Sequence, residues 1–177
     1  MREYLFRGKR VDNGEWVQGD LSQHKTGKKF IKCGSAIQSY EVIPESVCQY
    51  TGMNEFVMSD RSFHQPLFEG DIVEVWSTRR PYYTNPKSQY DGDVKVRAVI
   101  CFKHGEWHLD YDNNYNKTLT KLRGREEDDR VVDGDWRLYY FGCHGDEEWQ
   151  REHNSRSKWH DIVKLGNVFD NADLLEG

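Results

Sequence analysis

Apolar and polar residues alternate most regularly between Val94 and Tyr111. Even positions are apolar before the His104-Gly105 pair, and odd positions are apolar after it. A two-residue turn at His104-Gly105 would place all these side chains on one face of a β-hairpin, whereas a slip of one residue would reverse the faces. His104 would then need a positive φ, which histidine tolerates better than most residues. The predicted register pairs Phe102 with Trp107, Ile100 with Leu109, Ala98 with Tyr111, Lys103 with Glu106, and Arg97 with Asp112.

Shorter patterns predict further strands and turns. The Asn13-Gly14 pair, which tight hairpin turns prefer, predicts a second hairpin around Val11–Trp16. Near the end of the chain, Asp170 is predicted to cap a helical turn over residues 171–175. No longer segment has the period of an amphipathic helix, so the sequence predicts a mainly β fold. Other strands are predicted at Lys28–Cys33, Gly70–Trp76, Trp136–Gly142 and Lys158–Leu165.

The composition agrees with this fold class. Of the 177 residues, 36% are hydrophobic, and 8 Phe, 6 Trp and 10 Tyr supply much of that fraction. Aromatic and β-branched residues favour strands, whereas alanine, the best helix former, is rare. The mean hydropathy is −0.93 and 31% of residues are charged. We therefore expect a core built from a few large rings, and we exclude a membrane protein, a coiled coil and a disordered tail.

The chain is acidic, with 25 basic and 30 acidic residues and a net charge of −5. This balance does not favour general DNA binding, which usually needs a basic face. Two stretches, Ser77–Tyr90 and Asn113–Arg125, are basic and contain no acid. The first also carries tyrosines, on which unpaired bases stack, so it is a candidate contact for nucleic acid or an acidic partner. Its alternative role is that of a solvated loop. The candidate contact residues are Arg79, Arg80, Tyr82, Tyr83, Lys87 and Tyr90.

No motif identifies a catalytic, cofactor or metal site. Cys101, His104 and His108 have a spacing that zinc ligands use, but they supply only half a site, so ordinary strand residues are the preferred interpretation. The acidic start of a calcium loop at Asp110 lacks the glycine and the closing glutamate that such a loop needs. No nucleophile elbow or phosphate-binding glycine loop is present. We therefore expect no catalytic, cofactor-binding or metal-binding residues, and the sequence leans away from an enzyme.

The cysteines and the start of the chain indicate the compartment. The four cysteines contain no CxxC pair, and Met1–Tyr4 is not followed by an apolar signal segment. We expect a cytoplasmic protein without a disulfide framework.

Four motifs resemble the YopX family, which phages and prophages encode. The first runs from Arg2 to Lys9 and continues into Asp12–Val17, similar to the opening hairpin of that family. The others are Pro44–Gly52, Phe68–Val73 and Leu165–Leu175, and all four follow the family's order. The segment Met53–Leu67 departs from the family because it lacks the usual DKNGK turn. Cys48 stands where the family often has glycine, which argues against a catalytic thiol.

The resemblance implies a mainly β fold with a small, partly open SH3-type β-barrel and additional antiparallel hairpins. It implies a phage or prophage origin and a bacterial host cell, but no reaction and no site residues. We expect a single unit over residues 1–177, with a subdivision between an N-terminal hairpin region, 1–55, and a barrel region, 56–177. The expected function is a non-catalytic binding or interaction module. The alternatives are a nucleic-acid-binding small barrel, a self-associating structural protein, or an enzyme without a recognisable motif.

Overall fold

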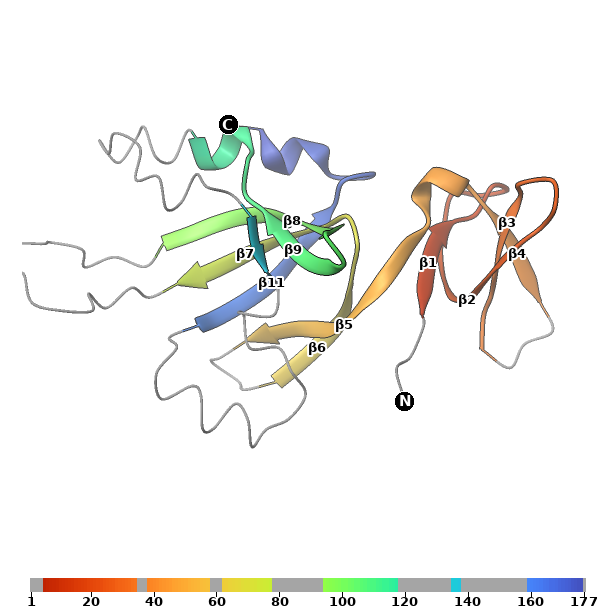
Figure 1. Cartoon of the computed structure of the whole chain (residues 1–177), viewed down its shortest axis with the longest axis horizontal. Coiled ribbons are helices and arrows are strands. Elements are labelled where there is room, and N and C mark those ends of the chain that lie inside the picture. Colours follow the sequence, from red (N-terminus) through yellow and green to blue (C-terminus); the bar gives the residue numbers. More distant parts are fainter. Residues whose placement is uncertain are drawn as a thin grey trace, which may run out of the picture.

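The structure is a computed structural model that describes residues 5–34, 38–57, 62–77, 94–117, 135–137 and 159–176. Antiparallel strands dominate these residues, and the helical segments among them are short turns (Figure 1). The predicted mainly β fold, with antiparallel hairpins and little helix, is therefore confirmed. None of the described helices is long and apolar enough to cross a membrane.

Four short strands form the first part of the fold, which we call the N-terminal strand group. Each strand pairs antiparallel with the next one along the chain. An isolated bridge between Arg10 and Val42 brings the end of the fourth strand back to the end of the first. The group therefore curls around Ile31 and Val42, which are buried. Its strands are β1 (Phe6–Lys9), β2 (Trp16–Gln23), β3 (Lys29–Lys32) and β4 (Ser39–Val42).

The hairpin predicted around Asn13-Gly14 is the β1–β2 hairpin, in which Lys9 pairs with Trp16. Its connection is longer than a two-residue turn, because the Arg10 N–H donates to the Glu15 carbonyl across residues 10–15. Gly14 has a φ of 74°, but Asn13 lacks the positive φ that a two-residue Asn-Gly turn also requires.

The fifth strand, β5 (Cys48–Val57), belongs to both parts of the fold. It follows a short 3-10 turn, η1 (Pro44–Ser46), and its first residues pair with β1, with Cys48 opposite Arg7. Its later residues pair with β6 and β11 instead, with Phe56 opposite a residue of each. The predicted division between residues 55 and 56 falls within this strand and stays a prediction.

The remaining strands build a larger antiparallel sheet, which we call the C-terminal sheet. Its order is β10-β9-β8-β7-β11-β5, and β6 also pairs with β5. The last strand thus lies between two strands from the middle of the chain. The described strands do not close into a barrel, so the SH3-type barrel is not confirmed. The new strands are β6 (Ser62–Phe68), β7 (Asp71–Ser77), β8 (Val94–Lys103), β9 (Glu106–Asp110), β10 (Asp135–Arg137) and β11 (Trp159–Asn167).

The strands predicted at Lys28–Cys33, Gly70–Trp76 and Lys158–Leu165 are confirmed as β3, β7 and β11 within a few residues of each boundary. Of the strand predicted at Trp136–Gly142, the structure describes only the first two residues, which lie in β10.

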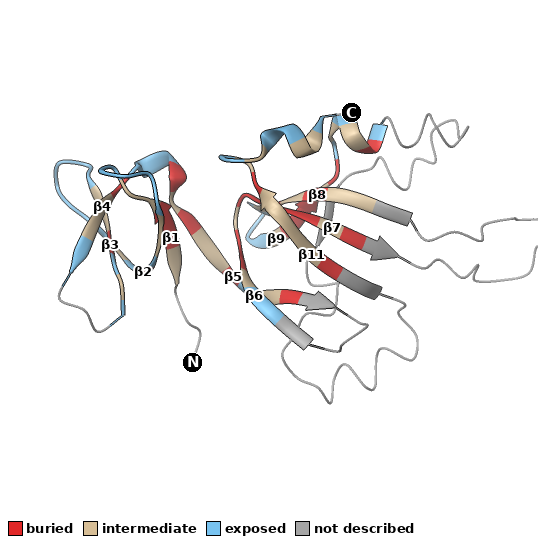
Figure 2. Ribbon diagram, turned by 180° about the vertical axis from the view of Figure 1, so that it is seen from behind, coloured by how far each residue is buried: buried red, intermediate tan, exposed pale blue. Residues whose placement is uncertain are grey.

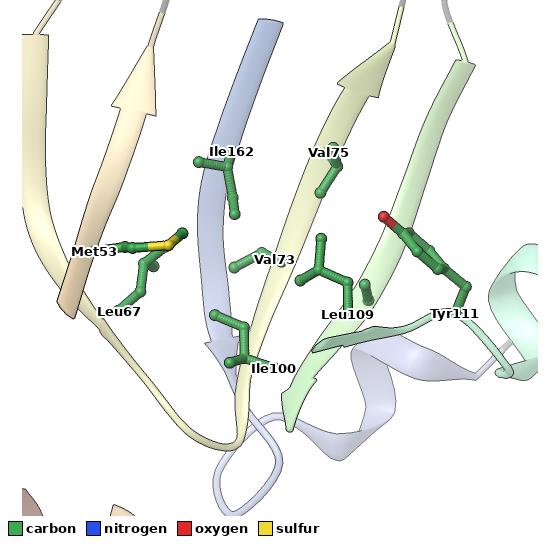
Figure 3. Close-up of a cluster of buried hydrophobic side chains, with 9 residues drawn as sticks. Met53, Leu67, Val73, Val75, Ile100, Leu109, Tyr111 and Ile162 are labelled. Carbon is green, nitrogen blue, oxygen red and sulfur yellow. The ribbon is translucent and has the colours of Figure 1, made fainter. Parts of the chain in front are cut away.

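The C-terminal sheet has an aliphatic core, in which side chains from neighbouring strands converge (Figure 3). Among the described residues, Tyr111 is the one buried ring of this cluster, Trp107 packs against the cluster, and Phe68 is a fully buried ring outside it. Rings thus contribute to the core, but aliphatic side chains outnumber them. Phe102 is 50% exposed beside the hairpin turn, where the Trp107 ring packs against it with ring centroids 4.9 Å apart. The cluster consists of Met53, Leu67, Val73, Val75, Ala98, Ile100, Leu109, Tyr111 and Ile162.

The β8–β9 hairpin has the predicted turn, and its register matches the prediction from Val99 to Lys103. His104 has a φ of 53°, as expected. The predicted pairings of Ala98 with Tyr111 and of Arg97 with Asp112 are wrong, because β9 ends at Asp110. The Arg97 guanidinium instead lies 3.8 Å from the centre of the Tyr115 ring and donates to the Leu174 carbonyl at 2.7 Å.

The chain ends in a 3-10 turn, η3 (Ala172–Leu175), close to the predicted helical turn. Asn171 occupies the position that precedes the turn, and no side chain caps it by a hydrogen bond. The prediction that Asp170 caps this turn is therefore wrong. The Asp170 carboxylate is directed to the N-terminal strand group instead, as the next section describes.

Candidate functional site at the junction of the two strand groups

Polar side chains from distant parts of the sequence meet where the N-terminal strand group contacts the C-terminal sheet. We call this place the junction. All four sequence motifs contribute to it, although they are far apart along the chain. The junction residues are Arg7, Lys9 and Trp16 from the first motif, Cys48 from the second, Phe68, Glu69, Gly70 and Asp71 from the third, and Asn167, Phe169 and Asp170 from the fourth.

The centre of the junction is a buried ion pair. Arg7 Nη2 lies 2.5 Å from Asp71 Oδ1, and both side chains are almost inaccessible to solvent. Asp71 is the first residue of β7, and its Oδ2 accepts the Phe68 N–H at 2.9 Å across the turn between β6 and β7. Lys164 on β11 places its Nζ 3.2 Å from the same oxygen. One buried carboxylate thus joins three segments of the chain.

Aromatic rings enclose the Arg7 guanidinium. Its Cζ lies 4.7 Å from the centre of the Trp16 ring and 4.8 Å from that of Phe68. Arginine is suited to this position because its planar guanidinium stacks on aromatic faces while its edge donates hydrogen bonds. Here Nη2 also donates to the Glu69 carbonyl at 3.4 Å. The rings exclude water, and the low local dielectric strengthens the pair with Asp71.

A second polar cluster lies at the edge of the junction, around Asp170. This carboxylate accepts hydrogen bonds from Lys9 Nζ, from Trp16 Nε1 at 2.8 Å and from Asn167 Nδ2 at 3.0 Å. These three donors, with Lys9 first, lower the pKa of Asp170 to about 2. The neighbouring Phe169 ring meets the Trp16 ring edge to face, with centroids 5.8 Å apart. The tip of the fourth motif is therefore attached to the N-terminal strand group.

The turn between β6 and β7 fits closely between its neighbours. Gly70 has a φ of 75°, and a Cβ added to it would lie 3.3 Å from Val168 Cγ2 and 3.8 Å from Cys48 Sγ. Cys48 is buried, and its Sγ donates to the Ser46 carbonyl at 3.3 Å. Burial raises the pKa of the Cys48 thiol, with Arg7 opposing that effect. A neutral thiol is a weak nucleophile, so this position suits packing.

Glu69 completes the ionisable groups of this turn. Its partial burial raises the pKa of its carboxyl, and its backbone N–H donates to the Gln49 carbonyl at 3.0 Å. Most polar groups of the junction hold one another, although Arg7 Nε and Asp71 Oδ1 are buried without a hydrogen-bond partner among the described residues. Their arrangement is that of an architectural connection between two groups of strands.

The residues singled out from the sequence lie elsewhere or outside the described part. Arg79, Arg80, Tyr82, Tyr83, Lys87 and Tyr90 all lie outside the described residues.

Two patterns considered for metals are described. Cys101 faces His108 across β8 and β9, as the register predicted, and the His104 and His108 rings are 6.3 Å apart. Asp110 pairs with Lys103, and Asp112 pairs with Lys117. No group of three or more metal-binding side chains lies within the described residues.

Sequence reasoning interpreted Asp170 as a helix cap and so missed the junction. A signal was present at Asp71, because it lies two and four positions before Val73 and Val75 and so shares their apolar face of the predicted strand. A charge in such a place indicates a buried partner, but the sequence alone does not name that partner. We compared the chain with protein-family models, with curated proteins and with solved structures, and found no match.

Proposed function

We propose that this chain is a non-catalytic interaction module of YopX type, encoded by a phage or prophage and acting in the cytoplasm of a bacterial host. In this proposal the N-terminal strand group is a recognition lobe, and the junction holds it in a fixed position on the C-terminal sheet. The observation that carries the proposal is the ion pair between Arg7 and Asp71, which ties the first motif to the third.

The contacts of the junction support a recognition lobe that is held in place by the C-terminal sheet. Asp71 is held by Arg7 from the first motif, and Asp170 is held by Lys9 and Trp16 of the same motif. Residues that fix two groups of strands need no chemistry of their own, yet their loss would release the lobe.

The exposed parts of the lobe support a role in recognition. The connection at residues 10–15 and the turn at residues 24–28 consist largely of exposed residues (Figure 2). Exposed turns on a rigid β scaffold commonly carry binding functions. The thiol of Cys48, with its raised pKa, and the carboxylate of Asp170, fully engaged by donors, suit structural rather than catalytic work.

The test is site-directed capture with the full chain. A photo-crosslinking amino acid replaces Thr26, in the exposed turn of the lobe, or Asp173, an exposed residue of the η3 turn outside the lobe. Both proteins are irradiated in a lysate of phage-infected bacteria, with and without nuclease. We expect one defined partner to be captured from position 26 and not from position 173. Capture from position 173 alone, capture from neither position, or turnover of a substrate by the purified chain would contradict the proposal.

Capture of a second copy of the same chain is the outcome that the structural alternative predicts. Light scattering on the purified protein separates that case, because the chain alone has a mass of 21.0 kDa. A stable oligomer joined through position 26 would assign the lobe to self-assembly and contradict recognition of another molecule.

A further inference from the structure

The β2–β3 hairpin carries a local excess of positive charge. Residues 21–40 contain Lys25, Lys28, Lys29 and Lys32 together with His24, and they contain no Asp or Glu. This stretch has a charge of +4 in a chain whose net charge is −5, so the other residues together carry −9. The stretch is longer and more basic than Ser77–Tyr90, and most of it is described.

The hairpin presents this charge on a defined scaffold. The His24 N–H donates to the Lys28 carbonyl at 2.8 Å, and the Gly27 N–H donates to the His24 carbonyl at 2.9 Å. Ile31 is buried inside the strand group. Because side chains alternate along β3, Lys32 lies on the opposite, outer face, where it is exposed. Lys25 is exposed at the tip.

Two of the four lysines use their ammonium groups in contacts within the protein. Lys28 Nζ lies 3.0 Å from a carboxylate oxygen of Glu41, and Lys29 Nζ donates to the Pro44 carbonyl at 3.2 Å. The side chains of Lys25 and Lys32 make no ion pair or hydrogen bond with the residues that the structure describes. The charge of Lys25 is therefore available to a partner. Lys32 lies directly opposite Asp20 in the β2–β3 register, so its charge is accessible but partly offset by that carboxylate.

We propose that the β2–β3 hairpin binds the phosphate backbone of duplex DNA, with Lys25 and Lys32 as phosphate contacts. This inference rests on the proposed function, because it names the partner class of the recognition lobe. Because β3 is also paired with β4 along its length, the hairpin would meet DNA through its exposed turn and outer face, from which lysines contact phosphates without reading base edges. Lysines that neutralise phosphates release counterions, which gives affinity without sequence specificity.

The hairpin favours DNA over other acidic partners. A membrane-binding tip would present exposed aromatic or aliphatic anchors, whereas residues 24–28 are His, Lys, Thr, Gly and Lys. A protein interface would need an apolar centre, but Phe30 is partly covered in the sheet and the exposed tip is polar. Charge without an apolar anchor suits a polyphosphate.

The test measures binding of a fluorescent 20-base-pair duplex to the full chain by anisotropy over a range of salt concentrations. The first variant is the double substitution Lys25→Gln/Lys32→Gln. The matched control is Lys103→Gln/Lys117→Gln, which removes the same charge from lysines paired with Asp110 and Asp112. We expect the hairpin variant to reduce the slope of log K against log salt by about 2, since each phosphate contact contributes about 1. The control should keep the wild-type slope.

Three outcomes would overturn the inference. The first is absence of binding by the wild-type chain at about 50 mM salt, where phosphate contacts are strongest. The second is an equal loss of DNA affinity in both double variants. The third is competition by polyglutamate that is as effective as competition by unlabelled duplex. Circular dichroism of each variant checks the fold, which surface Lys→Gln changes should leave intact. If DNA binding fails while position 26 captures a protein, the inference is wrong and the proposed function stands.

Discussion

The guanidinium of Arg7 and the carboxylate of Asp71 form a buried ion pair, 2.5 Å between Nη2 and Oδ1, that joins β1 to β7. Lys164 contacts the second oxygen of the same carboxylate. Removing the shared anion would leave the buried Arg7 guanidinium without its counterion and facing the partly buried Lys164 ammonium. Loss of Asp71 is therefore costly, whatever the ion pair contributes relative to an apolar contact.

The first prediction concerns Asp71→Asn. The substitution keeps the size of the side chain and removes its charge, so Arg7 and Lys164 lose their counterion. We expect the free energy of unfolding to fall by about 3–5 kcal/mol, as for other buried pairs that lose one partner. Urea denaturation followed by fluorescence measures this loss.

The matched control is Asp112→Asn. Asp112 also pairs with a lysine, Lys117, but both side chains are largely exposed. An exposed pair contributes about 0–1 kcal/mol, so this change should be nearly neutral. Similar losses in both variants would show that the Arg7–Asp71 pair has no special role in holding the strand groups together.

The second prediction uses the pH dependence of Asp170. Its pKa of about 2 in the folded protein lies below that of an unfolded Asp, near 3.9. The bonds from Lys9, Trp16 and Asn167 therefore contribute fully above about pH 5 and are lost as the pH falls through 4 to 2. We expect Asp170→Asn to destabilise the protein by about 1 kcal/mol or less at pH 7, because the side chain is partly exposed.

The measurement is the free energy of unfolding of wild type and Asp170→Asn from pH 7 to pH 2.5. The difference between them should stay constant down to about pH 5 and then shrink toward zero, since protonation removes the same charge in the wild type. A difference that persists unchanged at pH 2.5 would contradict the role of the ionised carboxylate.

Some of the fold is readable from the sequence because its signals are local. The alternation around His104-Gly105 determines the β8–β9 register, since both strands and their turn lie within a few residues of one another. The same reasoning failed for Phe102, because alternation gives the face of a residue but not whether another strand covers it. Burial near a hairpin turn depends on the neighbours in space.

The junction was beyond such reasoning for a related cause. Lys9 and Asp170 are 161 positions apart, and no local pattern indicates that they meet. Asp170 has the residue type and place of a helix cap, so its local context favoured the wrong partner. The insertion of β11 between β7 and β5 creates the contact, and that pairing is set by the packing of the whole sheet. The basic stretch around Lys25, in contrast, could have been found by scanning for acid-free segments.

The third prediction concerns the core of the C-terminal sheet. Ile100 is completely buried in the aliphatic cluster, whereas Phe102, two positions along β8, is half exposed. We expect Ile100→Ala to lower the free energy of unfolding by about 2–5 kcal/mol, because it removes buried methylenes and leaves a cavity. Phe102→Ala should cost only about 1 kcal/mol, mainly its ring contact with Trp107. Equal losses measured by urea denaturation would place Phe102 in the core after all.

The fourth prediction separates backbone strain from crowding at the junction. Gly70 and Gly14 have almost the same φ, 75° and 74°, so alanine at either position would adopt an unfavourable left-handed backbone. A Cβ at Gly14 would meet nothing within 4 Å, whereas one at Gly70 would press on Val168 at 3.3 Å. We expect Gly14→Ala to cost about 1–2 kcal/mol from the backbone alone. Gly70→Ala should cost about 1–3 kcal/mol more, because the turn must move to relieve the contact.

Thermal and urea denaturation of the two variants measure this difference. The comparison is informative because the backbone term is shared, so the excess at Gly70 reports only how closely Val168, Phe169 and Cys48 pack around the turn. If Val168 rotates away freely, the two variants will have equal stability. That result would contradict tight packing around Gly70. An excess would instead show that the third and fourth motifs depend on each other sterically, in addition to the charges that join them to the first.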